Sequence, residues 1–346
     1  MARVLISGAS GLIGRALIPA LESRGSEVVR LVRHTPANNR EIQWDPTQAV
    51  SPRTVCGFDA VIHLSGENVA GRWTQAKKQR IRDSRVITTR NFAEALARAD
   101  SPPKIFLCAS AIGYYGNRGD ELLTEESPGG EGFLASTCRE WEEATEPATR
   151  AGIRVVNLRI GIVLSRHGGA LKQMLLPFRL GLGGRIGSGR QWLSWIHVDD
   201  LIAAVLHTLD SSVYVVECQS PSPEPLVALP FPRSVRESGN SDFTQPSSTS
   251  GERRAPSPGL LNRTVNLVAP NPVTNAEFTK TLAGILRRPA IFTIPATAAR
   301  LAFGELADEG LLASARVIPQ RLLDAGFQFR FPELESAVEE ALKTGT

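Results

Sequence analysis

The sequence predicts an α/β protein with a doubly wound parallel sheet and a smaller C-terminal lobe. Short, almost purely apolar runs recur along the first half of the chain, at 4–6, 28–32, 60–64 and 105–110. Such runs are typical of strands buried on both faces of a sheet. The segments between them change to helical spacing, which is the pattern of consecutive βαβ units.

A glycine-rich turn follows the first strand directly. Gly8, Gly11 and Gly14 have the spacing G-x-x-G-x-x-G and lead into a helix expected over 12–24, which Gly25 ends. The first glycine suits the tight turn, the second the approach of a pyrophosphate, and the third close packing of helix on strand. Free N–H groups at the helix start favour an anion. The stretch predicts dinucleotide binding, although an ordinary glycine-rich turn has the same spacing.

The second strand, 28–32, ends in Arg33-His34. Folds that prefer NAD commonly place an acidic residue here, about 20 positions after the glycines, where it binds the ribose 2′-hydroxyl. A guanidinium instead suits a 2′-phosphate. Arg33 therefore predicts NADP(H) over NAD(H), the alternative being a solvated basic turn.

The next two strands end in small or polar residues. The strand 59–64 is followed by Ser65 and Gly66, whose small side chains make room for the adenosine half of a dinucleotide. His63, within this strand, is expected to be packed in the core rather than catalytic. The strand 105–110 ends in Ser110 and is followed by Tyr114 and Tyr115. These three could orient a substrate hydroxyl or carbonyl, or Ser110 could satisfy local backbone groups while the tyrosines pack.

Composition excludes several classes of protein. A net charge of +4 over 346 residues does not suggest nucleic acid as a partner. The four cysteines are far apart and lack C-x-x-C pairing, which argues against a zinc site or a disulfide framework, so no metal is predicted. No apolar run reaches about 18 residues, and the first strand begins at once, so we expect neither a membrane span nor a targeting peptide, and a cytoplasmic location.

Composition changes abruptly at 220–258, which holds eight prolines and nine serines in 39 residues. Such a segment buries too little apolar surface to offset its conformational entropy, so disorder is expected. Either a partner-binding linker or a translated intron would explain it. After it we expect a strand at 264–269, a helix capped by Thr274 or Asn275, a strand at 289–295, and helices at 296–303, 311–317 and 333–342.

Several motifs together resemble the short-chain dehydrogenase/reductase superfamily in its extended, epimerase-like branch, and more closely its atypical "epimerase family" members. They cover the chain except roughly 212–262, and they are the glycine turn, 59–66, 111–116, 124–128, 177–184, 195–200, 270–278 and 317–321. The resemblance implies a Rossmann domain over 1–211, with parts of a substrate-side lobe near 171–195, an insertion at 212–262, and a C-terminal α+β lobe over 263–346.

The resemblance also implies site residues. Carried over by motif, the pyrophosphate is held by Gly8, Ser10, Gly11, Leu12, Ile13 and Gly14, and the 2′-phosphate by Arg33. Leu64 and Ser65 flank the adenosine, and Arg85 points into the cofactor cleft. Val163, in an expected strand over 155–164, approaches the nicotinamide. The loop 181–189, with Arg179, Arg185 and Arg190, could close over an anionic ligand or simply turn. Asp199 or Asp200 is expected to be the cap or a first-turn acid of a helix, with a role in capping and domain packing rather than in catalysis.

One departure from the superfamily matters most. Its catalytic members carry a Tyr-x-x-x-Lys helix, in which the lysine lowers the tyrosine pKa so that the phenol exchanges a proton. The corresponding segment, 132–142, contains neither residue. Two hypotheses follow: an NADP(H)-dependent oxidoreductase or epimerase acting on a small polar substrate through Ser110, Tyr114 or Tyr115, and an NADP(H)-binding sensor or scaffold. For its assembly we consider a homodimer.

Overall fold

The central sheet has seven strands, all parallel, and the strand order reverses between β1 and β4. The structure is a computed structural model that describes residues 1–211 and 263–343. In spatial order the strands are β3 (Glu41–Gln43), β2 (Glu27–Val32), β1 (Arg3–Ser7), β4 (Ala60–His63), β5 (Ile105–Ala111), β7 (Arg154–Ile160) and β12 (Arg263–Leu267).

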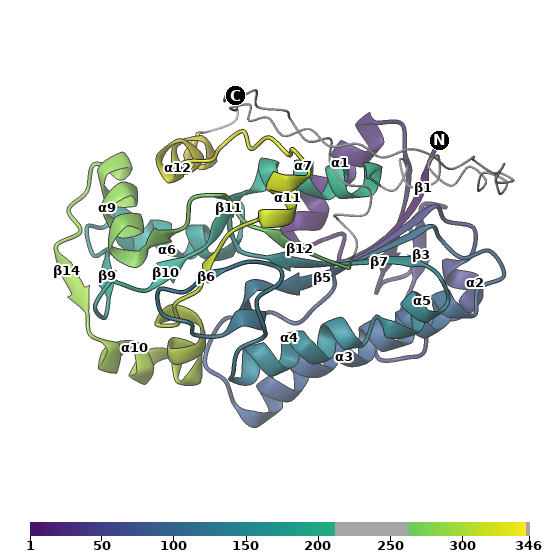
Figure 1. Ribbon diagram of the computed structural model, residues 1–346, viewed down its shortest axis with the longest axis horizontal. Helices are drawn as coiled ribbons and strands as arrows, with labels where there is room; N and C mark the ends of the chain where they lie inside the picture. The colour runs from purple at the N-terminus through teal and green to yellow at the C-terminus, as the bar shows by residue number, and fades with distance from the viewer. Residues whose placement is uncertain (212–262, 344–346) are drawn as a thin grey trace, which may run out of the picture.

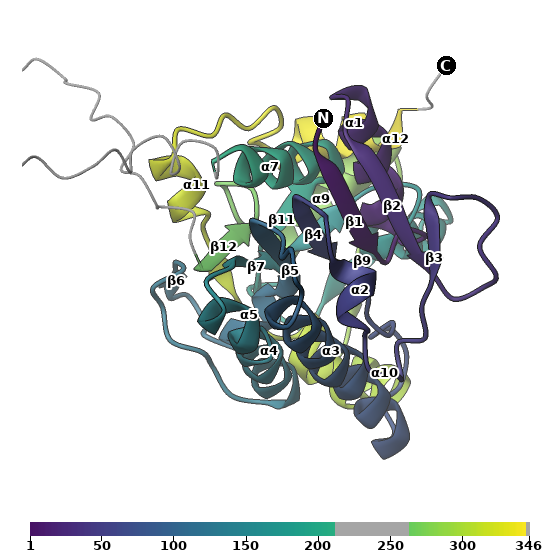
Figure 2. The ribbon, with the colours of Figure 1, turned by 90° about the vertical axis from the view of Figure 1, so that its right-hand side faces the viewer.

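Helices cover both faces of this sheet, as the uninterrupted apolar strands require (Figures 1 and 2). Val4 and Ile6 pack in one core cluster, with the helices α1 and α7, and Leu5 between them packs in the other, with α3, α4 and α5. The helices beside the sheet are α1 (Leu12–Ser23), α7 (Val198–Asp210) and α11 (Gln320–Asp324) on the first face, and α2 (Pro52–Val55), α3 (Gln75–Ala97), α4 (Phe133–Glu143) and α5 (Glu146–Arg150) on the second. The predicted α/β fold is confirmed.

A smaller lobe lies beyond one end of the sheet, at the left of Figure 1. It has its own core, which includes Trp195, Phe278 and Leu334. Its helical elements are α6 (Gly169–Arg179), α9 (Asn275–Leu286), α10 (Ala296–Phe303), the π-helical turn η2 (Ala307–Leu311) and α12 (Leu334–Leu342). Its strands pair in twos: β8 (Ile162–Leu164) with β11 (Trp195–His197), β9 (Gly184–Ile186) with β14 (Phe292–Ile294), and β10 (Trp192–Leu193) with β13 (Val273–Thr274); β6 (Leu122–Leu123) pairs with β15 (Arg316–Val317).

The structure corrects three local expectations. The helix expected at 311–317 is wrong, since η2 ends at Leu311 and β15 occupies 316–317. The run 155–164 is two strands, because Gly161 lies against the neighbouring backbone: a Cβ there would be 2.7 Å from the Ser194 carbonyl oxygen. The strand that follows the insertion, β12, joins the large sheet rather than the C-terminal lobe. The predicted disorder at 220–258 lies outside the described residues.

Candidate functional site

A cleft of about 810 Å³ opens at the carboxyl ends of β1, β2 and β4, beside the point where the strand order reverses. Open α/β sheets bind ligands at this position. Six of the predicted cofactor residues line it: Gly8, Ser10, Gly11, Arg33, Leu64 and Ser65. The first turn of α1 holds Leu12, Ile13 and Gly14, and Val163 lies on β8.

The glycines of the turn have the packing roles expected of the first and third. Gly8 has a φ of +73°, and a Cβ there would lie 2.7 Å from the Leu64 carbonyl carbon. A Cβ on Gly14 would lie 2.4 Å from the Gly8 carbonyl oxygen, so a side chain here would push α1 away from β1. These contacts confirm the tight turn and the close helix packing. The start of α1, where the first N–H groups have no partner within the helix, is open to the cleft.

The wall of the cleft is basic at the end of β2. Arg33 and His34 follow that strand, Arg15 comes from α1, and all three are exposed and line the same cleft. The carboxylate on this wall, Glu41, faces Arg30 at 3.9 Å. Sequence reasoning missed Arg15, although its position directly after Gly14 places it in the first turn of the helix. An anionic group entering here meets several cations.

Arg85 lies beside Gly66, which lines the cleft. Its guanidinium lies 3.3–3.5 Å from where a Gly66 Cβ would be, so the two residues are in close contact. Its Nη1 donates to the Ile81 carbonyl at 3.0 Å, and the guanidinium stacks over Trp141 at 5.1 Å. Burial lowers the pKa of Arg85, and within the described ranges no carboxylate comes within ion-pair distance. That Arg85 points into the cofactor cleft stays a prediction.

Ser110, one of the three predicted catalytic residues, is committed to a buried network. Its hydroxyl donates to Glu142 Oε1 at 2.7 Å, and the side chain is 3% exposed. Glu142 also accepts from Arg159 Nε and Nη2, both at 2.8 Å. A serine has one proton to donate, and the carboxylate takes it. Ser110 in this arrangement presents only acceptor capacity to a substrate.

Tyr115 does not fit a direct catalytic role. It is fully buried, and its hydroxyl lies 2.7 Å from Asn266 Oδ1 and 3.0 Å from the Thr124 carbonyl oxygen while it accepts from Arg159 Nη1 at 3.0 Å. Burial raises the pKa of Tyr115 to about 12. Such a phenol exchanges protons poorly near neutral pH and has no free face for a substrate. The expectation of a catalytic Tyr115 is therefore corrected to a structural one.

Tyr114 remains half-buried at the edge of the same network. The Arg159 guanidinium lies 3.4 Å from its ring centroid, and a Cβ on Gly129 would lie 3.1 Å from its Cζ. Sequence reasoning missed the network that links these residues. The signal was Arg159, a charge in the middle of an apolar strand, because such a residue is almost never buried without a partner.

The helix that replaces the Tyr-x-x-x-Lys segment is α4. Glu309 of η2 caps its first turn, accepting from the backbone N–H groups of Phe133 (2.7 Å) and Leu134 (2.6 Å). Cys138 on this helix is buried, and burial raises the pKa of its thiol to about 12, so it is not a reactive nucleophile. From this helix, the ion-paired Glu142 contacts Ser110.

The motif at 195–200 begins α7, with Asp199 and Asp200 in its first turn, as one of the two alternatives predicted. His197, not an aspartate, accepts from the Asp199 N–H at the start of α7 (3.2 Å). Asp200 is buried and accepts from the backbone N–H groups of Arg330 (2.8 Å) and Phe331 (2.9 Å). This aspartate thereby ties the C-terminal segment to α7.

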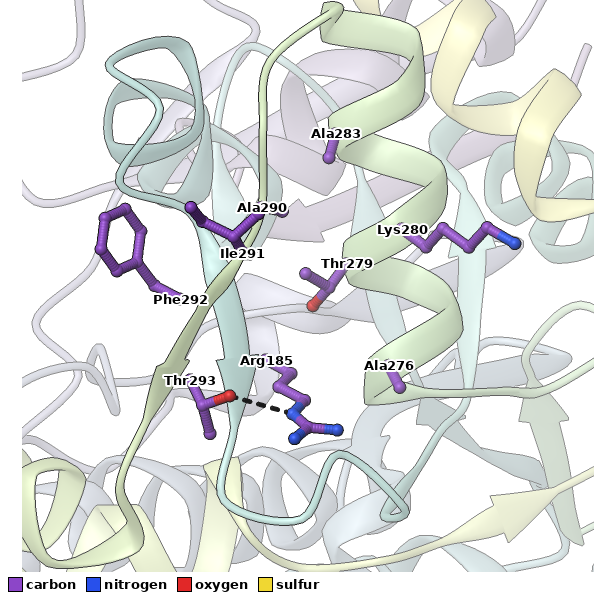
Figure 3. A pocket seen from close by; sticks show the side chains of 9 residues that line it. All are labelled: Arg185, Ala276, Thr279, Lys280, Ala283, Ala290, Ile291, Phe292 and Thr293. Atoms are coloured by element: carbon purple, nitrogen blue, oxygen red, sulfur yellow. Dashed lines mark hydrogen bonds between the residues drawn. The ribbon is translucent and has the colours of Figure 1, made fainter.

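The loop 181–189 is part of the smaller lobe's own structure. Its residues 184–186 form β9, which pairs with β14, and Arg185 Nε donates to Thr293 Oγ1 at 3.0 Å. A pocket of about 380 Å³ lies between this pair and α9, and alanines leave its space open (Figure 3). Arg185 borders this pocket, while Arg179 and Arg190 are exposed elsewhere on the surface.

Across 1–211 and 263–343, no group of three or more His, Cys, Asp or Glu side chains could hold a metal ion. No helix in those ranges is long and apolar enough to cross a membrane.

Comparison with known proteins gives the family. A profile described as the NAD dependent epimerase/dehydratase family matches residues 4–216, and one described as a domain of unknown function, DUF1731, matches 294–341. The chain is 40% identical over 337 residues to Epimerase family protein Mb2239 of Mycobacterium bovis, covering 97% of this chain and 96% of that protein. It is 35% identical over 342 residues to Epimerase family protein SDR39U1 of Homo sapiens, covering 98% and 99%.

Solved structures agree. The crystal structure of human SDR39U1 (isoform 2) with NADPH matches with a TM-score of 0.77 and 32% identity, covering 98% of both chains. A nucleoside-diphosphate sugar epimerase from Corynebacterium glutamicum matches with a TM-score of 0.68 and 33% identity, covering 99% of this chain and 58% of that one. The protein therefore belongs to the NAD-dependent epimerase/dehydratase family, among the relatives named epimerase family proteins.

Proposed function

We propose that this protein binds NADP(H) in the cleft beside the glycine turn and acts as an NADP(H)-dependent oxidoreductase or epimerase on a small polar substrate. The observation that carries the proposal is the basic wall formed by Arg33, His34 and Arg15. This wall lies next to a glycine turn in which a side chain on the first or third glycine would clash with the neighbouring backbone. The human relative solved with NADPH supports the same cofactor.

In this proposal each part of the cleft has a separate task. The glycine turn and the first N–H groups of α1 hold the pyrophosphate, and Arg33 binds the 2′-phosphate. Leu64 and Ser65 flank the adenosine. The bound cofactor supplies hydride transfer at its nicotinamide, beside which Val163 is expected. Arg85 donates hydrogen bonds into the cleft from a site where burial leaves it few other partners.

Proton transfer is the step for which this site has the fewest available residues. Of the three predicted residues, Ser110 donates to Glu142 and Tyr115 is buried in the network. Tyr114 is the one we propose to contact substrate. We expect Tyr114→Phe to lower NADPH-dependent turnover of a carbonyl compound or sugar nucleotide at least tenfold, and Tyr115→Phe to leave it within about twofold. Stopped-flow or steady-state NADPH absorbance measures both, and the reverse order would contradict the assignment.

A second candidate function is a sensor or scaffold that binds NADP(H) without efficient chemistry. Two observations favour it. Ser110 and Tyr115 form hydrogen bonds within the protein, and α4 contains neither tyrosine nor lysine. Tight NADPH binding without turnover of any compound in a carbonyl and sugar-nucleotide library would favour it over the enzyme.

Arg33→Ala tests the cofactor assignment. We expect it to weaken NADPH binding about 10- to 100-fold, because it removes charge-assisted hydrogen bonds to the 2′-phosphate, and to leave NADH binding almost unchanged. Fluorescence titration of both cofactors gives the two dissociation constants. Arg40→Ala is the matched control, since Arg40 is exposed, pairs with Glu22 and lies outside the cleft wall. Equal losses for NADPH and NADH would refute the role of Arg33.

A further inference from the structure

The pocket in the smaller lobe lies apart from the proposed cofactor site. It is enclosed by the β9–β14 pair and α9, and none of its lining residues belongs to the cleft at the carboxyl ends of β1, β2 and β4. Its volume of about 380 Å³ is at the lower end of the range, about 300–1,000 Å³, of pockets that bind small molecules. Its lining side chains therefore define which small molecule it fits.

The pocket is polar at one end and apolar at the other. Figure 3 shows Arg185 and Thr293 at the end beside the start of α9. The opposite end, toward the last turns of α9, is lined by Ala283, Ala290 and Ile291. The Ile291 side chain is 81% exposed, so a ligand at this end would cover apolar surface that the lobe itself leaves open. A ligand with one polar and one apolar part fits both ends.

Arg185 is held in place through one of its nitrogens and keeps the other two available. Its Nε donates to Thr293 Oγ1 at 3.0 Å. Its stem packs close to the main chain of Gly189, where a Cβ would lie 3.3 Å from Arg185 Cδ. Within 1–211 and 263–343, Nη1 and Nη2 form no hydrogen bond or ion pair, and no aspartate or glutamate lines the pocket. Two neighbouring N–H groups of a guanidinium match the two oxygens of a carboxylate.

A hydroxyl on α9 points into the same space. Thr279 is 5% exposed and lines the pocket, and Figure 3 shows its side chain directed toward the β9–β14 pair. This hydroxyl has no hydrogen-bond partner among the described residues, so it has a proton to donate to a ligand. The N–H groups at the start of α9, in contrast, already donate to the Gln191 and Gly189 carbonyls and to Thr274 Oγ1. An anion in the pocket is therefore held by side chains and not by the start of the helix.

We propose that this pocket is a second ligand site, which binds a small carboxylate with an apolar body. Arg185 Nη1 and Nη2 donate to the two carboxylate oxygens, and the Thr279 hydroxyl donates to one of them. The apolar body lies against Ala283, Ala290 and Ile291, where its burial supplies the rest of the binding free energy.

The charge of the pocket favours a carboxylate over a phosphate. Lys280 also lines the pocket, but Figure 3 shows its ammonium group extending to the other side of α9, which leaves Arg185 as the cation directed at the ligand. One guanidinium balances the single charge of a carboxylate. A phosphate monoester carries a charge of about −1.5 to −2 at pH 7 and would keep part of it uncompensated.

Two carboxylates with different apolar bodies, naphthalene-2-carboxylate and octanoate, test the site on the full-length protein. Isothermal titration calorimetry at about pH 7, with about 1 mM NADP+ present to occupy the cofactor cleft, measures their dissociation constants. For molecules of this size we expect a value of about 1 mM or lower for at least one of them. The uncharged 2-naphthamide has the same body as naphthalene-2-carboxylate and should bind at least about tenfold more weakly, because it lacks the charge that pairs with Arg185.

Two variants alter the two ends of the pocket separately. Arg185→Gln removes the cation, and Ala290→Phe fills the apolar end; each should raise the dissociation constant at least about tenfold. Arg179→Gln and Ala298→Phe are the matched controls, because they make the same substitutions at exposed positions of the smaller lobe that do not line the pocket. The controls should change the dissociation constant by no more than about twofold. Circular dichroism checks that all four variants fold.

Four results would overturn the proposal. The first is that neither carboxylate binds saturably up to about 10 mM, well above the dissociation constant expected for its size. The second is binding that both Arg185→Gln and Ala290→Phe leave intact, since the ligand would then lie elsewhere. The third is equal affinity for the carboxylate and 2-naphthamide, which would make the pocket an apolar site without a role for charge. The fourth is tighter binding of 2-naphthyl phosphate than of naphthalene-2-carboxylate, lost in Arg185→Gln, which would assign the pocket to a phosphate.

Discussion

Glu142→Gln is expected to lower the free energy of unfolding by about 3–5 kcal/mol, because it leaves the buried Arg159 without its counter-charge. The pair is bidentate, and its side chains are 5% and 12% exposed. Burial lowers the pKa of Arg159, and the pairing with Glu142 more than offsets this effect. Without that pair the guanidinium still stays charged, because arginine remains protonated in proteins at neutral pH. Urea denaturation at pH 7 measures the change.

Two controls separate this effect from ordinary loss of a salt bridge. Glu146→Gln breaks the exposed pair of Glu146 with Arg150 on α5 and should change stability by no more than about 0.5 kcal/mol. The double variant Glu142→Leu with Arg159→Met should recover much of the loss, since replacing both partners removes the uncompensated charge. A loss below about 1 kcal/mol for Glu142→Gln would mean that the network tolerates solvent and does not hold Ser110 in place.

Acidification from pH 7 to pH 5 is expected to cost about 2 kcal/mol of stability through His63 alone. This histidine is fully buried among aromatic rings, and burial lowers its pKa to about 3. The unfolded chain takes up a proton below its ordinary pKa of 6.5, whereas the folded chain does not. The stability contributed by neutral His63 is therefore complete above about pH 6.5 and is lost as the pH falls from 6.5 toward 3.

The difference between wild type and His63→Gln isolates this effect from the other titrating groups. Denaturant unfolding of both proteins at pH 7 and pH 5 gives the comparison. Wild type should lose about 2 kcal/mol more than the variant over this interval. If the two proteins lose stability in parallel, His63 takes up its proton in the folded state too, and its burial against Trp44 and Phe92 does not hold in solution.

Local chemistry along the chain predicted the glycine turn and several of the residues that line the cleft. Gly8 and Gly14 could be assigned because only glycine tolerates their backbone contacts, and that constraint is written in the sequence as a fixed spacing. Arg33 could be assigned because it directly follows a recognisable strand. His63 could be placed in the core for the same reason, as one polar residue inside an apolar run.

For the candidate catalytic residues, the local sequence did not predict which hydroxyl groups are already hydrogen-bonded. Ser110 and Tyr115 looked equally available in the sequence, since both follow the same strand. Their roles are decided by Glu142, Arg159 and Asn266, which come from α4, β7 and β12. The partner of a polar side chain, and not its own type, determines whether its proton is free.

The sequence by itself determined the first buried strands with the helix between them, the glycine turn and the basic residue after β2, because each depends on neighbours within a few positions. Only the tertiary structure decided which hydroxyls are free, which charge is buried with which, and which apolar side chains remain uncovered on the smaller lobe. Those properties depend on contacts between residues up to 151 positions apart, as between Tyr115 and Asn266. No local pattern records such contacts, because packing brings the partners together only when the whole sheet has formed.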